Sequence, residues 1–236
     1  MKPPAKKETR AHAVYRALRR AVIEQALRPG MKLPEDSIGE QLGVSRTLVR
    51  EAFGRLALEG LVTLEPNRGA FVAYPTLEDG RDAFEVRRAL EGLVARTLAG
   101  RLTADQEAAL LDHLRREEAA LGKDGSESIR LAGEFHGLLA DMTGNALLAR
   151  FVQEVSSRCS LILAIYGRPH SSDCAVSEHR QLIDALRRGD ADRAAALMDA
   201  HLQAVAARAL LHPRPDAGDL RRLLAPYAQS EGLTAP

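Results

Sequence analysis

Three histidines in the C-terminal half of the chain lie on apolar faces of separate helical stretches, where they could together bind a metal ion. His179 lies on the face of its stretch that carries Leu182 and Leu186. His201 lies on the apolar face of a second stretch, and His136 lies at the edge of a third. Neutral imidazoles converging from three helices would bind Zn²⁺, with Ni²⁺ or Mn²⁺ as alternatives, and leave a position open for a ligand. A hydrogen-bonded core histidine is the alternative interpretation for each of them.

A second candidate site lies in residues 42–62, LGVSRTLVREAFGRLALEGLV. If Ser45 caps a helix there, the apolar side chains share one stripe, formed by Val49, Ala52, Phe53 and Leu56. Arg46, Thr47 and Arg50 share a different sector of the same helix. Forked guanidinium donors near the start of a helix suit the edges of bases in a DNA groove. A solvated basic surface is the alternative.

The composition indicates a globular chain with an aliphatic, helical core. Of its 236 residues, 45% are hydrophobic and 28% are charged, whereas aromatic residues are only 4% and Trp is absent. No apolar run approaches the ~20 residues that cross a bilayer. The two cysteines, Cys159 and Cys174, are too few for a disulfide scaffold, and we expect a core position and a helix start for them. The sequence therefore predicts a cytoplasmic protein without a membrane partner.

Charge is distributed unevenly along the chain. Residues 1–76 carry 13 Lys and Arg against 8 Asp and Glu, whereas the remainder carries 20 against 24. A basic first third joined to an acidic remainder favours a nucleic-acid-binding module followed by a separate domain.

The first part of the chain has the order of a winged helix-turn-helix. Residues 11–27 predict a helix that ends at RPG, and LPEDSIGEQLG predicts a short second helix. The arginine-bearing helix follows after a short turn, as in a helix-turn-helix. Two strands, 61–64 and 70–74, are then joined by a Pro-Asn-Arg-Gly turn. We expect a basic tail at 1–10 and a winged domain at 11–75.

From residue 76 to residue 211 the sequence pattern predicts only helices. Thr76 and Thr103 are suited to cap the first two helices. The expected helices cover 76–99, 103–122, 126–142, 146–166, 174–188 and 191–211. The sequence therefore predicts a mostly α protein, in which an antiparallel bundle of about six helices at 76–211 follows the winged domain. Residues 212–236 are expected to be a C-terminal tail.

Several motifs resemble those of a known family. LRPGMKLPEDSIGEQLGVSRTLVREAFGRLALEGLVTLEPNRGAFV resembles the winged helix-turn-helix of GntR-type bacterial transcription regulators. AFEVRRALEG, EFHGLLADMTGN and EHRQLIDALRRGD are similar to the effector-binding helical domain of the FadR-like branch. The resemblance covers residues from about 11 to 211. It implies a homodimeric regulator, usually a repressor and not an enzyme, that binds a short inverted repeat in double-stranded DNA and a small-molecule effector.

The resemblance also assigns DNA-contacting residues. The recognition-helix positions that match the family are Ser45, Arg46, Thr47 and Arg50. Gly69 matches the wing tip near the minor groove, where the absence of a Cβ permits close approach. Some members carry a basic residue where this chain has Asp36, and a carboxylate cannot hold a phosphate, so Asp36 is assigned no DNA contact.

In the helical domain, many FadR-like regulators bind a metal through three histidines and an acidic residue one turn before the first. That position is Ala132 here, and Glu134 points to nearly the opposite side of its helix. An ion held by histidines alone would keep its full charge and attract a carboxylate effector strongly. Arg87 matches a basic residue of the family's effector cavity and could hold that carboxylate. A surface ion pair with Glu91 is the alternative for Arg87.

Two other functions stay open at this point. One is a regulator whose cavity holds an apolar effector and no metal, which Ala132 favours. The other is a metallohydrolase using the three histidines, fused to a DNA-binding domain. Against an enzyme, no spare carboxylate lies at ligand-adjacent spacing to act as a general base.

Overall fold

A computed structural model of the chain describes residues 9–122, 125–167, 173–207 and 220–232. These residues form ten helices and three strands, which confirms the predicted mostly α fold. The chain divides into two compact units. The winged unit comprises Met1–Ala73 with Pro215–Pro236, and the bundle unit comprises Tyr74–Arg214. Most of the predicted N-terminal tail lies outside the described residues. Within these ranges, no helix combines the length and the apolar character that crossing a membrane requires.

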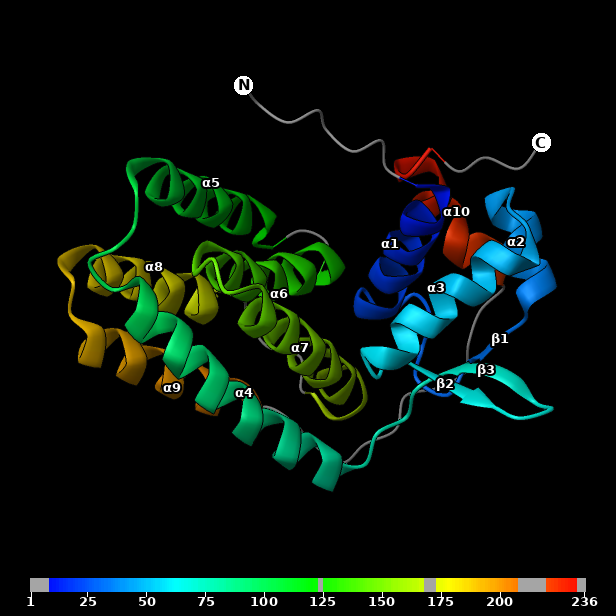
Figure 1. Ribbon diagram of the computed structural model, residues 1–236, viewed down its shortest axis with the longest axis horizontal. Helices are drawn as coiled ribbons and strands as arrows, with labels where there is room; N and C mark the ends of the chain where they lie inside the picture. Colours follow the sequence, from blue (N-terminus) through cyan, green and yellow to red (C-terminus); the bar gives the residue numbers. More distant parts are fainter. Residues whose placement is uncertain (1–8, 123–124, 168–172, 208–219, 233–236) are drawn as a thin grey trace. The chain divides into compact units, whose positions relative to one another are not determined.

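The winged unit packs three helices beside a small sheet (Figure 1). Its elements are α1 (Arg10–Ile23), β1 (Lys32–Leu33), α2 (Glu35–Leu42), α3 (Arg46–Leu58), β2 (Val62–Glu65) and β3 (Gly69–Val72). Helix α3 packs on α1 and α2. Its predicted apolar stripe is fully buried and consists of Val49, Ala52, Phe53 and Leu56. The hairpin of β2 and β3 was predicted, but β1 was not. It pairs antiparallel with β3, giving the strand order β1-β3-β2.

A tenth helix, α10 (Leu220–Ser230), completes the winged unit. It packs against both α1 and α2 and buries Leu224 and Tyr227. Arg20 of α1 lies over the ring of Tyr227, 5.4 Å from its centroid, and Arg16 forms an ion pair with Glu231 just after the helix. The sequence analysis treated this segment as a tail and missed the helix. Its apolar residues are buried because the helix packs against α1 and α2, which lie far earlier in the sequence.

The bundle unit consists of the expected six helices. They are α4 (Leu77–Leu98), α5 (Ala104–Ala120), α6 (Gly125–Met142), α7 (Ala146–Tyr166), α8 (Asp173–Arg188) and α9 (Ala191–Ala207). Thr76 and Thr103 form capping boxes, in which each hydroxyl accepts a hydrogen bond from the backbone three residues later. Asn145 caps α7 through its side chain. These local signals place the helix starts within a residue or two of the predicted positions.

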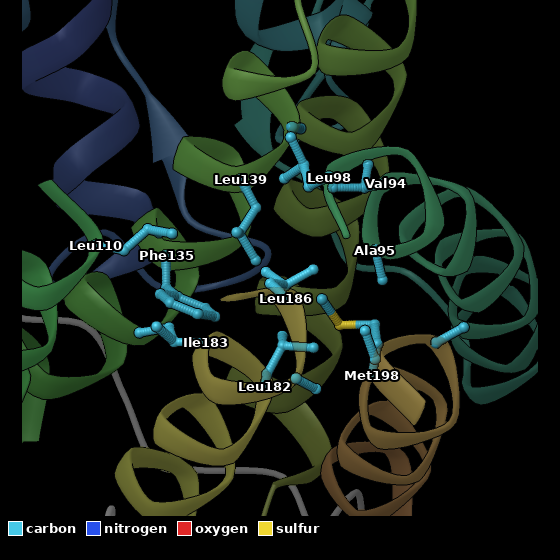
Figure 2. Packing of buried hydrophobic residues seen from close by; sticks show 14 of the residues in the cluster. Val94, Ala95, Leu98, Leu110, Phe135, Leu139, Leu182, Ile183, Leu186 and Met198 are labelled. Atoms are coloured by element: carbon cyan, nitrogen blue, oxygen red, sulfur yellow. The ribbon is translucent and has the colours of Figure 1, made fainter. Parts of the chain in front are cut away.

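The core of the bundle is mostly aliphatic and includes one aromatic side chain, Phe135 (Figure 2). Leu110, Leu139 and Leu186 are less than 2% exposed, and they come from α5, α6 and α8. Burying one such side chain stabilises the fold by roughly 1.5–3 kcal/mol. Met198 adds a fully buried contact from α9. Because α6, α8 and α9 all turn an apolar face into this core, the histidines on those faces are brought together.

Candidate functional site

The predicted DNA-contacting residues lie exposed at the start of α3 and at the turn of the wing. Ser45 is the N-cap residue in extended backbone, although its side chain makes no capping hydrogen bond. Arg46, Thr47 and Arg50 are all exposed, whereas the apolar stripe of the same helix is buried. Gly69 begins β3 with φ +99°, and nothing lies within 4 Å of the place where a Cβ would be. The exposed face of α3 and the open wing tip are suited to a DNA duplex.

Both arginines predicted to contact DNA, Arg46 and Arg50, contact carboxylates at the start of α2. Arg46 pairs with Asp36, and Arg50 Nε donates to Glu35 Oε2 at 2.8 Å. The hydrogen bond and charge of Glu35 raise the pKa of Arg50 above its ordinary value. Exposed ion pairs contribute little to the stability of a fold. The main consequence of these pairs is that they occupy the guanidinium groups of the two arginines. In this structure the guanidinium groups are held on protein carboxylates, an arrangement that the sequence analysis did not predict.

The three histidines of the predicted metal site meet inside the bundle. His136 of α6, His179 of α8 and His201 of α9 are all buried, and one ligand atom from each lies within 4.8 Å of the others. His201 Nε2 is 3.3 Å from His136 Nε2. His179 Nε2 is buried without a hydrogen-bond partner among the described residues. An unpaired buried polar atom costs about 1–3 kcal/mol, so the cluster suits a partner that takes up nitrogen lone pairs.

A carboxylate lies behind each histidine of the cluster. Glu117 Oε2 of α5 accepts a hydrogen bond from His179 Nδ1 at 2.8 Å. Glu178 Oε2 of α8 accepts one from His201 Nδ1 at 2.6 Å. Glu91 Oε2 of α4 accepts the third hydrogen bond, from His136 Nδ1. An ionised carboxylate can only accept, so each Nδ1 carries a proton, and in a neutral imidazole the Nε2 atom then keeps its lone pair.

The buried charges support this protonation pattern. Burial lowers the pKa of His136 to about 3, so the imidazole is neutral at neutral pH. Burial alone would raise the pKa of Glu91, but the charge of Arg87 and the hydrogen bonds from Arg87 and His136 lower it to about 2. Burial also lowers the pKa of His201. Two neutral Nε2 atoms with facing lone pairs repel each other, and a bound cation would remove that repulsion.

Arg87 is buried within the bundle. Its Nε donates to Glu91 Oε1 at 2.6 Å, and its guanidinium interacts with the thiol of Cys159. Burial raises the pKa of Cys159 to about 11, so this core cysteine stays a thiol. The alternative interpretation, a surface ion pair with Glu91, was correct about the partner, but the pair is buried and does not lie on the surface. Contact between Arg87 and an effector stays a prediction, and the side chain of Cys174 lies outside the described part of the structure.

Ala132 lies one turn before His136 and supplies no ligand, and Glu134 is exposed. Among the described residues, the group that could hold a metal ion consists of the three histidines. The sequence analysis missed the carboxylates behind them. A signal for one was present, because Glu117 follows Leu114 at helical spacing and thus occupies an apolar face.

Two family models match the chain. Residues 10–72 match the bacterial regulatory proteins of the gntR family, and residues 82–204 match the FCD domain. The two matches divide the chain close to the boundary between the winged unit and the bundle unit.

Curated relatives and solved structures agree with these matches. The chain is 28% identical to the HTH-type transcriptional repressor RspR of Escherichia coli, over 81% of this chain and 85% of the relative. It is 31% identical to the Nta operon transcriptional regulator of Aminobacter aminovorans, over 77% and 85%. A transcriptional regulator from Rhodococcus sp. RHA1 has a similar structure, with 28% identity, a TM-score of 0.70, and coverage of 85% and 97%. The fold also resembles McbR/YncC of E. coli, with a TM-score of 0.74, 20% identity, and coverage of 84% and 95%.

Proposed function

Because the chain belongs to the GntR family of bacterial transcription regulators, we propose that it is a repressor whose FCD bundle binds a divalent metal ion and an organic carboxylate. As a family member the chain is a DNA-binding regulator with an effector-binding helical domain. The family and the curated relatives are regulators and not enzymes, so the fused metallohydrolase has no support. The proposal therefore concerns the ion, the effector, the DNA contacts and the oligomer.

The convergence of three buried Nε2 atoms carries the metal proposal. His136, His179 and His201 would hold the ion, and the unpaired Nε2 of His179 is the atom that most needs such a partner. Neutral imidazole suits Zn²⁺, our first choice, with Ni²⁺ or Mn²⁺ as alternatives. When bound, the ion supplies a positive, Lewis-acidic centre that a carboxylate oxygen can coordinate. The effector is therefore proposed to be a small organic acid.

Arg87 is proposed to help bind the carboxylate of the effector. Its Nε–H is used by Glu91, but a guanidinium has five N–H donors. Its charge also favours an anion in this part of the bundle, where the low dielectric strengthens the attraction. Arg87 would therefore orient the effector carboxylate while it remains paired with Glu91.

In the winged unit, Arg46 and Arg50 are proposed to read base edges, since an arginine fork bonds guanine O6 and N7. Ser45, Thr47 and the backbone amides at the start of α3 would bind phosphates. Gly69 would bring the wing close to the minor groove. The exposure of all five residues supports these roles.

The regulator is proposed to act as a homodimer on a short inverted repeat. One recognition helix contacts too few base pairs for useful specificity, and two-fold symmetry matches two half-sites. Effector binding in the bundle would then shift the population between dimers of high and low operator affinity.

The test is metal analysis of the full chain purified without chelators. We expect up to one divalent ion per chain, removable by mild chelation, and its loss in His179→Ala. The control His12→Ala changes a histidine of the winged unit and should leave the ion content unchanged. DNA selected by the wild type from random duplexes then reports whether removing the ion changes operator binding.

A wild type without any ion, together with unchanged DNA binding in His179→Ala, would show that the histidines are structural. The metal-free cavity for an apolar effector would then be the better description of the bundle.

A further inference from the structure

We propose that Glu91, Glu117 and Glu178 are positioning residues that aim the three histidines at the metal and balance its charge. This inference rests on the proposed metal site, but it assigns to these glutamates a role that neither the family matches nor the relatives assign. The acidic residue absent at Ala132 would thus be replaced by carboxylates that never touch the ion.

The first step is the geometry of the hydrogen bonds. Each carboxylate takes the Nδ1–H of a different histidine, with distances of 2.8 Å at Glu117 and 2.6 Å at Glu178. The three glutamates come from α4, α5 and α8, so three different helices each supply one carboxylate to the histidine cluster. A carboxylate on Nδ1 fixes the tautomer and the ring orientation of a metal-binding histidine and raises its basicity.

The second step is that two of these carboxylates are buried and have few described partners besides the histidines. Glu117 is 3% exposed, and its second oxygen lies 3.3 Å from His113 Nε2. That nitrogen, however, has a closer acceptor in the carbonyl oxygen of Leu131, at 2.9 Å. Glu91 is 1% exposed and bonds only Arg87 and His136 in the contacts described. Burying a carboxylate costs free energy unless the group is paired and hydrogen-bonded. The hydrogen bonds from the histidines therefore offset part of this cost.

The third step is the charge of the cluster. Three carboxylates and the guanidinium of Arg87 leave two net negative charges around the histidines. A divalent ion carries the opposite charge, so the ion and these four side chains together are neutral. Because Ala132 adds no carboxylate, the sequence analysis expected an ion with uncompensated charge. The three buried or half-buried glutamates remove the basis of that expectation.

Glu178 is the best residue for a test. Its side chain is 31% exposed, so replacing it leaves less of a buried void than replacing Glu117. Replacing Glu91 would also leave the buried charge of Arg87 without its carboxylate partner. Glu178→Ala removes both the acceptor and the charge, whereas Glu178→Gln keeps a carbonyl acceptor and removes only the charge. Glu118→Gln is the matched control, because Glu118 pairs with Arg180 and touches no histidine in the described contacts.

The first readout is the affinity of each full-length variant for Zn²⁺, measured by competition with a chromophoric chelator. We expect Glu178→Ala to bind Zn²⁺ about 10- to 100-fold more weakly and Glu178→Gln to lose less than that. Glu118→Gln should match the wild type. If folded Glu178→Ala binds Zn²⁺ as tightly as the wild type does, the positioning role is wrong while the metal site stands.

The second readout is the tautomer of the histidines in the metal-free protein, obtained from nitrogen-15 NMR of the imidazole rings. We expect a proton on Nδ1 of His201 in the wild type and a loss of this preference in Glu178→Ala. This measurement needs no metal, so it separates the two proposals. A protein that binds no Zn²⁺ but has this tautomer pattern loses the proposed metal function and the charge balance, and the glutamates then only orient the histidine rings. A proton on Nε2 of wild-type His201 overturns the positioning role.

Discussion

At the scale of single residues, the base contacts proposed for Arg46 and Arg50 would require each arginine to exchange a carboxylate for a base edge. Arg46 leaves Asp36 and Arg50 leaves Glu35 before either can bond a base. In the proposed complex the protein carboxylates would also lie near the phosphates of the duplex, which would add repulsion. On this proposal, specific binding depends on the difference between the bonds formed with bases and the ion pairs that are given up.

Arg46→Ala and Arg50→Ala should each weaken binding to selected DNA by about five- to 150-fold, the range expected for a bidentate contact with guanine. Neither change should alter the fold, because both side chains are exposed. Fluorescence anisotropy at one fixed salt concentration measures the effect. An arginine whose loss changes affinity by less than twofold does not read a base.

Asp36→Asn should strengthen DNA binding by about two- to fivefold, because it frees Arg46 and removes a negative charge near the phosphates. Asp36→Glu keeps the charge and serves as the control in the same assay. Weaker binding by Asp36→Asn would mean instead that the carboxylate orients Arg46 for its base.

Sequence periodicity was sufficient to bring the histidines together, because 100° per residue places His179 and His201 on the buried faces of their helices. The same rule could not find their partners. Glu91 and Glu117 lie far from these histidines in sequence, and their contacts depend on which helices are neighbours. Periodicity gives the face of a helix, but not the helix that packs against it.

At the scale of elements, helix starts were predictable because a capping box involves residues only three apart. Thr76 and Asp79 illustrate this at the start of α4. Helix α10 was not predictable in the same way, since its stability comes from burial against α1, about 200 residues earlier. Without that surface, Leu224 and Tyr227 read as apolar residues of a Pro-rich tail.

Thr76→Ala and Asp79→Ala should each lower the free energy of unfolding by about 1 kcal/mol at neutral pH, since each removes a bond of the capping box. Hydrogen bonds from the Thr76 hydroxyl and backbone lower the pKa of Asp79 below its ordinary value of 3.8. Its contribution is therefore complete above that value and is lost as the pH falls through the lowered pKa. Urea unfolding followed by circular dichroism measures both effects.

The cost of Asp79→Ala should shrink in acid, whereas the control Asp105→Ala on α5, outside this box, should not show that pH dependence. A cost for Asp79→Ala that is constant from neutral pH to acid would show that the ionised carboxylate does not stabilise α4.

At the scale of the whole molecule, the bundle leaves apolar side chains exposed on α4. Val86 and Leu93 are 52% and 51% exposed, and their spacing of seven residues places them on one face. If that face forms the proposed dimer contact, Leu93→Glu should convert the dimer to a monomer at micromolar concentration and weaken DNA binding. Leu111→Glu, at an exposed leucine of α5, is the control. Sedimentation of Leu93→Glu as a dimer would exclude this face.

Helix α10 makes the winged unit depend on a segment that follows the bundle. Leu224→Ala should destabilise this unit by about 2–5 kcal/mol, because Leu224 is fully buried against its helices. Hydrogen exchange should therefore become faster at the amides of α1 and α2, and remain unchanged in the bundle. Gln229→Ala, at an exposed position of the same helix, should leave the exchange rates as they are. Unchanged exchange in Leu224→Ala would mean that α10 does not stabilise the winged unit.

The position of α10 also has a consequence for synthesis on the ribosome. Translation makes α1 to α3 first, then the roughly 140 residues of the bundle unit, and only then the last helix of the winged unit. At about 5–20 residues per second, the first helices wait on the order of 10 s for α10. During that interval the surface that will cover Leu224 and Tyr227 is open to water or to chaperones. A nascent chain therefore completes its DNA-binding unit only after its effector-binding unit has been made.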